Sequence, residues 1–238
     1  MSERLDPERL TLLLNEYLSA MTDIILESGG TIDKYEGDAI IAFWNAPLTQ
    51  NDHAARAVRS ALHCQERLAG LRSDFKARFG CDLFMRIGIN TGSVVVGNLG
   101  SSQRFDYSIL GDSANVAARL EGVNKEFGTE ILISEACRNQ LPAEIQVREI
   151  GRVGVVGRKE PITVFEPLAQ GDTERDARLA RFAQALAQYY RGEISEARVA
   201  FQELAADDAV AARYVARCRE LLDNPPLAWD GVWRMGSK

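Results

Sequence analysis

The order of two hydrophobic patterns constrains this chain more than any other feature. Residues 7–28, 52–79 and 112–127 repeat apolar residues at the three- and four-residue spacing of amphipathic helices. Between these stretches lie short apolar runs bounded by glycines and polar turns, which are typical of strands. The resulting order of helix, two strands, helix, strands, helix and strands predicts an α+β or α/β sandwich, in which helices pack on a mixed sheet.

The first two strand-like runs flank a turn. Residues 31–35 and 38–44 are separated by Glu36-Gly37, which predicts a β-hairpin. The second run is almost wholly apolar, so we expect it to be a buried central strand. Further strands are expected at 83–90, 105–110, 131–134, 147–156 and 163–166.

The composition changes near residue 170. From 176 to 222 the chain is rich in Ala, Arg, Leu and Glu, which predicts a tail of about three helices. The spacing of its small and aromatic residues resembles one tetratricopeptide unit: Ala185, Tyr189, Gly192, Ala197 and Phe201. One unit cannot bury its own apolar face, so the tail is expected to pack on the main domain or on a partner. A helical cap without a peptide-binding role is the simpler interpretation. We therefore divide the chain into a domain at 1–170 and a helical tail at 171–238.

Charge and cysteine content limit the class of protein. The net charge of −6 argues against general binding of nucleic acid, which requires a basic surface. No apolar run reaches the roughly 20 residues of a membrane-spanning helix, and the N-terminus has no secretory signal. The four cysteines are widely spaced and the chain has only two histidines, which argues against a zinc site and favours a reducing, cytoplasmic compartment.

Three segments, in this order and separation, resemble the class III nucleotide cyclase family. They are GGTIDKYEGD at 29–38, RIGINTG at 86–92 and FDYSILGDSANVAARL at 105–120. The resemblance covers residues 1 to about 168 and implies a ferredoxin-like catalytic domain. It implies an adenylate cyclase that converts ATP to 3′,5′-cyclic AMP and pyrophosphate in signal transduction, with two Mg²⁺ or Mn²⁺ ions.

Asp38 is the candidate metal ligand. It follows a turn glycine and leads into an apolar strand, and a carboxylate fixed at such a place suits a divalent cation that acts on phosphates. The resemblance identifies Asp38 as the family's second metal aspartate. For the residue alone, a turn-forming Gly-Asp pair is the alternative.

Lys34 and Ser108 are the candidate base-recognition residues. The resemblance places both against the adenine ring, although adenine users usually carry Asp or Thr at the position of Ser108. The Glu and Cys of guanine-selective members are absent, so ATP is favoured over GTP. For Lys34 alone, an exposed lysine that protects a sheet edge is the alternative.

Asn115 and Arg119 are the candidate catalytic residues. They lie four residues apart and therefore on one helix face. The resemblance places Asn115 on the ribose and Arg119 on the phosphates in the transition state. The small residues between them, Val-Ala-Ala at 116–118, predict a face that something approaches closely. Arg158 matches the position of a lysine that binds the terminal phosphates, and a basic β-turn is the alternative for it.

The resemblance also implies a homodimer. The metal aspartates come from one chain, and the base-recognition and transition-state residues come from the other. Family members begin this domain with a strand of the form Phe-x-Asp-Ile-x-Gly-Phe-Thr, which carries the first metal aspartate and which this sequence lacks. We therefore expect exposed edges on the neighbouring strands. We also expect weak or absent turnover unless another segment supplies the carboxylate.

Residues 225–233 resemble the tail of bacterial members that carry a sensor and transmembrane helices upstream. That resemblance places the domain on the cytoplasmic side of the inner membrane. Three other functions remain open: a catalytically silent cyclase-like module that binds nucleotide or dimerises for regulation, a diguanylate cyclase, and a scaffold that binds partners through its tail. Gly29-Gly30 does not continue into the Gly-Gly-Asp/Glu-Glu-Phe turn of diguanylate cyclases.

Overall fold

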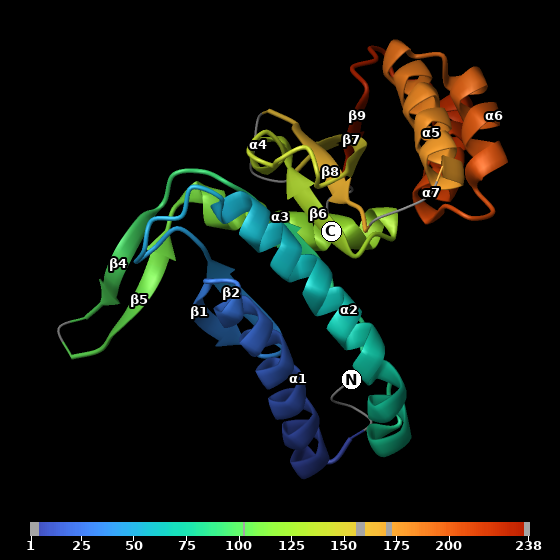
Figure 1. Cartoon of the computed structure of the whole chain (residues 1–238). Coiled ribbons are helices and arrows are strands. Elements are labelled where there is room, and N and C mark those ends of the chain that lie inside the picture. Colours follow the sequence, from blue (N-terminus) through green and yellow to red (C-terminus); the bar gives the residue numbers. More distant parts are fainter. Residues whose placement is uncertain (1–4, 102, 156–159, 170–172, 236–238) are drawn as a thin grey trace.

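The computed structural model describes residues 5–101, 103–155, 160–169 and 173–235 (Figure 1). The chain begins with helix α1 (Pro7–Glu27), the hairpin β1 (Thr31–Glu36) and β2 (Ala39–Phe43), and helix α2 (His53–Phe79). It continues with β3 (Ile87–Ile89), β4 (Val95–Gly100), β5 (Phe105–Leu110), α3 (Asp112–Phe127), β6 (Ile131–Ser134) and α4 (Glu135–Arg138). The last elements are β7 (Val147–Gly154), β8 (Ile162–Pro167), α5 (Thr173–Arg191), α6 (Ile194–Leu204), α7 (Ala209–Asp223) and β9 (Val232–Arg234).

A five-stranded mixed sheet forms the centre of the fold. Its order is β3-β6-β8-β7-β9, with parallel pairs at β3–β6 and β7–β9 and antiparallel pairs between β6, β8 and β7. The two hairpins, β1–β2 and β4–β5, form separate two-stranded sheets. The predicted α+β class, with helices packed on a mixed sheet, is confirmed.

The prediction that β2 is a buried central strand is wrong. Among the described strands, β2 pairs with β1 alone, so it has neighbours on one side only. Its middle residues are half-buried, and only Phe43 at its end is buried. The strand expected at 83–90 is also shorter, because only Ile87–Ile89 pair, and β3 lies at the edge of the five-stranded sheet. This arrangement agrees with the expectation of exposed strand edges.

Helices α1 and α2 pack side by side below the sheet (Figure 1). The buried residues of α1 recur every fourth position and meet a matching stripe of α2: Leu13, Tyr17, Met21 and Ile25 against Cys64, Leu68, Phe75 and Phe79. The Asp6 carboxylate caps α1 by accepting from the amide of Arg9 at 2.9 Å. Ile32, Ile40 and Ala42 of the first hairpin complete this core.

Helix α3 is held very closely to the edge strand β3. Its buried stripe is Val116, Leu120, Val123 and Phe127. A Cβ added at Gly88 of β3 would overlap the carbonyl oxygen of Ala117 and the amide nitrogen of Glu121. Near the other end of the helix, the amide of Asn124 donates to the carbonyl oxygen of Ile87 at 2.9 Å. The backbone of α3 therefore rests on β3 with no room for a side chain between them.

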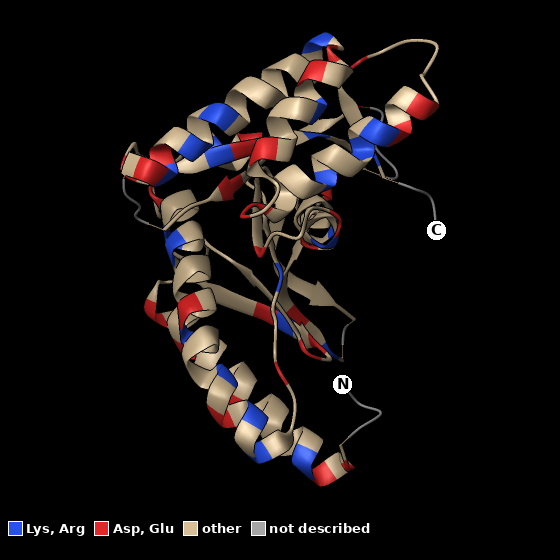
Figure 2. Cartoon of the chain, turned by 90° about the vertical axis from the view of Figure 1, so that its right-hand side faces the viewer, with Lys and Arg blue, Asp and Glu red and all other residues tan. Residues whose placement is uncertain are grey.

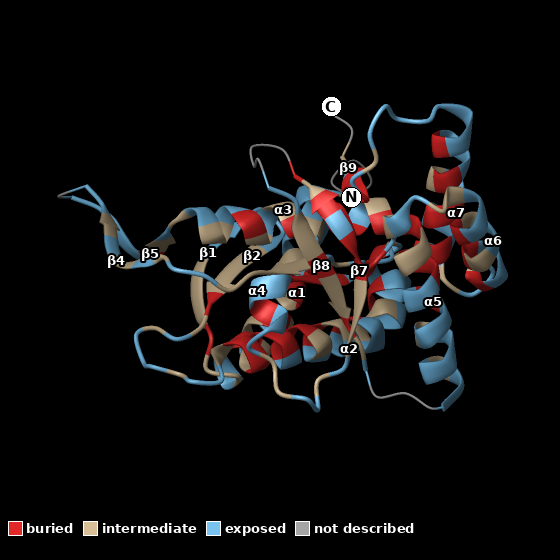
Figure 3. Cartoon of the chain, turned by 90° about the horizontal axis from the view of Figure 1, so that it is seen from above, coloured by how far each residue is buried: buried red, intermediate tan, exposed pale blue. Residues whose placement is uncertain are grey.

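The helical tail shares a core with α3 and the five-stranded sheet. Tyr214 of α7 is fully buried, and its hydroxyl donates to the carbonyl oxygen of Ile150 on β7 at 2.8 Å. Its ring stacks on Phe201, with centroids 4.6 Å apart, and meets Phe127 of α3 at 6.1 Å. Buried segments of β7 and α7 lie where the tail meets the sheet (Figure 3). After α7 the chain returns to the sheet as β9, a strand that the sequence patterns do not predict.

A partly buried ion network also joins the tail to the sheet. Arg148 of β7 binds Glu166 of β8 at 2.6 Å and also binds Asp208, which precedes α7. The Asp208 carboxylate caps α7 as well, accepting from the amide of Val210 at 3.0 Å. Burial raises the pKa of Glu166, while the charge of Arg148 opposes that shift. One carboxylate, Asp208, thus connects the start of α7 to the five-stranded sheet.

The remaining global features bear on the class of protein. Lys and Arg alternate with Asp and Glu along the helices, without a one-sign face in the view of Figure 2. Within the described ranges, no helix has both the length and the apolar character needed to cross a membrane. All four cysteines are free thiols, and burial raises the pKa of Cys64, Cys137 and Cys218 to about 11.

The contact between Gly88 and α3 predicts a large cost for any side chain there. Gly88→Ala should lower the free energy of unfolding by about 1–3 kcal/mol, because the methyl group would push the helix off the strand. Gly122→Ala is the matched control on α3, where an added Cβ meets no atom within 4 Å. It should stabilise by about 0.5–1 kcal/mol. Urea unfolding checks both values, and equal effects of the two substitutions would contradict this account of the packing.

The ion network predicts that Asp208 contributes to tail docking. Asp208→Ala should lower the free energy of unfolding by about 1–3 kcal/mol, since it removes a helix cap and a charged hydrogen bond together. Asp207→Ala, at the exposed neighbouring aspartate, should change it by less than about 0.5 kcal/mol. Thermal unfolding of the two variants compares them directly, and an equal loss in both would show that the network does not matter.

Candidate active site

A bulge in β1 sets the direction of its polar residues. Ile32 pairs with Ala42, but Lys34 pairs with Ile41, so Asp33 is an extra residue in the strand. Ile32 packs on the α1–α2 core, and the Tyr35 hydroxyl lies 2.8 Å from the Thr22 hydroxyl of α1. Because both of these side chains face the helices, Asp33 and Lys34 between them face the opposite side of the hairpin.

Asp33 and Lys34 form a close pair on that face. The Lys34 Nζ lies 3.7 Å from the Asp33 Oδ2. The Lys34 side chain is 49% exposed, whereas that of Asp33 is 3% exposed. Within the described part of the chain, the buried Oδ1 of Asp33 has no hydrogen-bond partner. The Lys34 ammonium group is therefore half-exposed to solvent and lies next to the buried Asp33 carboxylate.

Ser108 lies on the neighbouring hairpin. It is a buried residue of β5, opposite Gly97 of β4. β5 contacts β1, and the rings of Tyr107 and Phe43 lie 6.1 Å apart between the two hairpins. The structure thus brings the strand of Ser108 beside that of Lys34.

Asp38 lies in the exposed turn between β1 and β2. Gly37 before it has a φ of 65°, a left-handed conformation that glycine adopts without strain. The pKa of Tyr17 is raised to about 12, first by burial and then by the charge of Asp38. In the ranges the structure describes, no three potential His, Cys, Asp or Glu ligands cluster together. One carboxylate suits one Mg²⁺ ion that takes its other ligands from water and substrate phosphates, and it does not by itself suit two.

Asn115 and Arg119 lie on α3, turned away from its buried stripe. Asn115 is exposed, and the Arg119 Nη1 lies 3.8 Å from the Asp112 Oδ1. That Nη1 is buried and makes no hydrogen bond to a described residue. At the small residues between them, the close approach that the sequence predicts is made by a strand of the same chain. The strand β3, through Gly88, approaches the helix at Ala117, so a small residue there serves packing within the domain.

Hydrogen bonds to Asn90 and to the carbonyl oxygen of Ser93 hold the first turn of α3 in place. The Asn90 amide donates to the carbonyl oxygen of Ser113 at 2.9 Å, and the Ser134 hydroxyl donates to the Asn90 Oδ1 at 2.6 Å. The Ser113 hydroxyl in turn donates to the carbonyl oxygen of Ser93 at 3.2 Å. Sequence reasoning assigns Asn90 no role, although its place directly after a strand within a motif is a signal for one. Asn90 positions the helix that carries Asn115 and Arg119.

The candidate residues therefore form separate groups within one chain. Lys34 and Ser108 lie on adjoining hairpins, Asn115 and Arg119 share a helix, and Asp38 occupies a turn. We find no hydrogen bond or ion pair that joins Lys34 to Arg119 among the described residues. Arg158 lies outside the described residues.

The hairpin β4–β5 projects from the body of the molecule (Figures 1 and 3). Val95, Phe105 and Leu110 on it are 63%, 61% and 65% exposed. Tyr107 on the same hairpin is 38% exposed. Scattered apolar residues are ordinary on a protein surface, but four on one projecting hairpin are typical of a surface that a partner covers.

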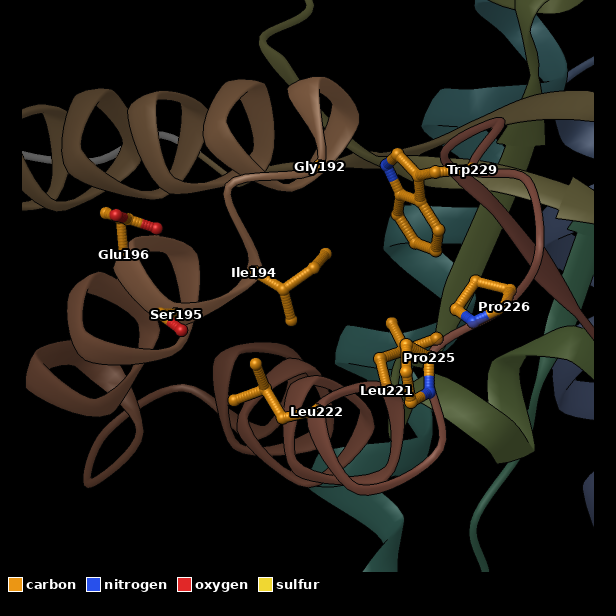
Figure 4. Close-up of a pocket in the computed structure, with 9 residues that line it drawn as sticks. All are labelled: Gly192, Ile194, Ser195, Glu196, Leu221, Leu222, Pro225, Pro226 and Trp229. Atoms are coloured by element: carbon orange, nitrogen blue, oxygen red, sulfur yellow. The ribbon is translucent and has the colours of Figure 1, made fainter.

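A hollow in the tail lies apart from all these residues. It has a volume of about 340 Å³ and is lined mainly by apolar groups, including Ile194, Leu221 and Trp229 (Figure 4). None of the candidate site residues contributes to it.

Taken as a whole, the fold matches those of solved nucleotide cyclases. The family profile described as "Adenylate and Guanylate cyclase catalytic domain" matches residues 1–166. The chain therefore belongs to the adenylate and guanylate cyclase catalytic domain family.

Three relatives show what the chain is similar to. It is 37% identical over 166 residues to "Adenylate cyclase 1" of Rhizobium meliloti, an alignment that covers 70% of this chain and 25% of that protein. The crystal structure of the adenylyl cyclase CyaB from P. aeruginosa aligns with a TM-score of 0.65 and 36% identity, covering 71% of this chain and 87% of that one. The crystal structure of the guanylyl cyclase Cya2 aligns with a TM-score of 0.64 and 34% identity, covering 72% and 86%. The chain thus spans about a quarter of the length of its curated relative, and the fold is common to cyclases of both bases.

Proposed function

We propose that this chain is the catalytic domain of an adenylate cyclase, which converts ATP to 3′,5′-cyclic AMP and pyrophosphate at sites shared by two copies of the chain. The observation that carries the proposal is the direction of Lys34. The bulge in β1 turns this lysine away from the helical core and onto the open face beside β5. In a member of the cyclase family, a lysine with this sequence context favours adenine.

The reaction requires few groups from the protein. The ribose 3′-oxygen attacks the α-phosphorus, its proton leaves, and the bond from that phosphorus to pyrophosphate breaks. Arg119 is permanently charged and has a nitrogen that makes no hydrogen bond to a described residue, so it suits the charge that develops on the phosphates. Asn115 is exposed on the same face and suits the ribose hydroxyls. Arg158, from the segment 156–159 that the structure does not describe, is proposed to bind the terminal phosphates.

Asp38 is proposed to hold a divalent cation, Mg²⁺ or Mn²⁺, together with the substrate phosphates. The cation would neutralise phosphate charge and favour the ionised ribose hydroxyl. A second ion needs a further carboxylate, which the family's first strand supplies in other members.

Selection of ATP over GTP is assigned to Lys34 and Ser108. A lysine ammonium only donates hydrogen bonds, while a serine hydroxyl both donates and accepts. Together they can serve a ring nitrogen and the amino group of adenine. Ser108 lacks the methyl group of threonine and the charge of aspartate, so we expect the preference for ATP to be moderate.

The homodimer is supported by the hairpin β4–β5. Val95, Phe105 and Leu110 expose apolar surface on an element that extends away from the core of its own chain. A second copy would bury this surface and bring the groups of two chains together, as a two-fold interface does.

A second candidate function is a regulatory module that binds nucleotide or dimerises without turnover. One observation favours it: the described residues hold no cluster of metal ligands around Asp38.

We also propose that the domain works in the cytoplasm, below a membrane-anchored sensor. Its free thiols and the family resemblance of residues 225–233 support this location.

The shared site predicts complementation between two inactive variants. Asp38→Asn and Arg119→Ala should each lower cyclic AMP formation about 100-fold or more, since each removes charge from both sites of a dimer. Co-expression of the two should restore roughly a quarter of the original activity, because half of the dimers are mixed and each mixed dimer has one intact site. Cyclic nucleotide formation from ATP and from GTP with Mn²⁺ is measured for each variant expressed alone and for the two expressed together. Arg181→Ala, at an exposed arginine of α5, is the control and should have no effect.

The assay is run on this chain and on a form extended upstream through the family's first strand. Activity that prefers ATP and disappears with Asp38→Asn supports the proposal in either form. Absence of product from both forms, while each is folded and dimeric, contradicts it. Nucleotide binding without product would then favour the regulatory module.

The apolar hairpin predicts a variant that separates the two copies. Phe105→Asp should convert the dimer to a monomer, because a carboxylate would have to be buried in the interface. Sedimentation equilibrium gives the molar mass. Val199→Asp, at a residue of α6 that is 55% exposed, is the matched control and should leave the dimer intact. Dimers that persist in Phe105→Asp would contradict a role of this hairpin in association.

A further inference from the structure

We propose that Asp33 is a positioning residue for base selection: its buried carboxylate holds the Lys34 ammonium on the open face of β1. The inference rests on the proposed function in one respect, that Lys34 contacts the nucleobase. The family resemblance of residues 29–38 assigns no role to Asp33, which in the sequence is an ordinary strand residue.

The first argument is the place of the bulge. In a regular strand, neighbouring residues point to opposite faces, so Asp33 and Lys34 could not lie together. The register shift between Ile32 and Lys34 puts both side chains on the face opposite α1. The irregularity in the strand therefore creates this acid–base pair.

The second argument is the difference in burial. A buried carboxylate requires a partner, because losing water without compensation is costly. The Asp33 side chain is 3% exposed and its carboxylate makes no hydrogen bond to any described residue, so Lys34 at 3.7 Å is its counter-charge. In the part of the chain that the structure describes, Asp33 is likewise the one ion-pair partner of Lys34.

The third argument is the freedom of the lysine. A flexible four-carbon side chain that is 49% exposed would sample many positions if nothing held it. The fixed negative charge beneath it confines the ammonium to one region and leaves its outward donors available. The separation of 3.7 Å is longer than a hydrogen bond, so the pair directs the ammonium without occupying it fully. Asp33 thus acts on the base through Lys34.

The test is a double-mutant cycle read out as base selectivity. In the original background, Asp33→Asn should lower kcat/KM for ATP about tenfold, mainly through KM. It should also lower the ratio of kcat/KM for ATP to that for GTP several-fold. In a Lys34→Met background, the same substitution should change neither quantity by more than about twofold, because the side chain it acts through is gone. Asp23→Asn, at an exposed aspartate of α1, is the control and should change nothing.

The ratio of kcat/KM for ATP to kcat/KM for GTP remains a valid measure even if a smaller fraction of the Asp33→Asn variant is folded. Both nucleotides are measured on one preparation, so the fraction of folded protein cancels from the ratio. An unchanged ratio with equal losses for ATP and GTP would overturn the inference, as would a full effect of Asp33→Asn in the Lys34→Met background.

Failure of the inference is separable from failure of the proposed function. If the original chain forms cyclic AMP and Asp33→Asn leaves the ratio unchanged, the inference falls and the function stands. If no form turns over, the same cycle is measured on equilibrium binding of ATP and GTP with Mg²⁺. A selective change in binding that depends on Lys34 then supports the role of Asp33 without the enzyme activity, and no change overturns it.

Discussion

The contact between α3 and β3 is the constraint on which the rest of the structure depends. Gly88 lets the helix backbone rest directly on the strand, and Asn124 fixes the far end of the helix to the same strand. With one face of α3 pressed onto the sheet, Asn115 and Arg119 have to lie on another. The position of the proposed phosphate-binding face therefore follows from a packing distance that only glycine permits.

The same helix connects the cyclase fold to the tail. Phe127 at its end contacts Tyr214 of α7, and its ring lies 4.8 Å from that of Trp233 on β9. The tail is thus part of the structure that supports α3, and no separate core is needed to stabilise it. A single tetratricopeptide-like unit cannot bury its apolar face alone, and here the catalytic sheet covers that face. Whether the tail also acts as such a repeat stays a prediction, as does the boundary at residue 170.

Most elements of the fold could be predicted because their signals are local. α3 occupies the predicted residues 112–127, and α1 and α2 differ from the predicted helices by a residue. The position of β2 could not be predicted in the same way. An apolar run is compatible with a central strand or with a hairpin that packs on helices, and the difference depends on which strands pair across the molecule. Strand β9 was missed because three residues after a long helical tail carry no periodic signal.

By itself the sequence determined the family and its candidate residues, since three motifs in register carry both. Lys34, Asp38, Ser108, Asn115 and Arg119 are candidates because the resemblance of those motifs to the family points to their positions. Only the tertiary structure decided which way they face and what supports them. The pairing of Asp33 with Lys34 depends on a register shift, and the role of Asn90 depends on the approach of residues 20 or more positions away. Such relations arise from non-local contacts, which no single segment of the sequence encodes.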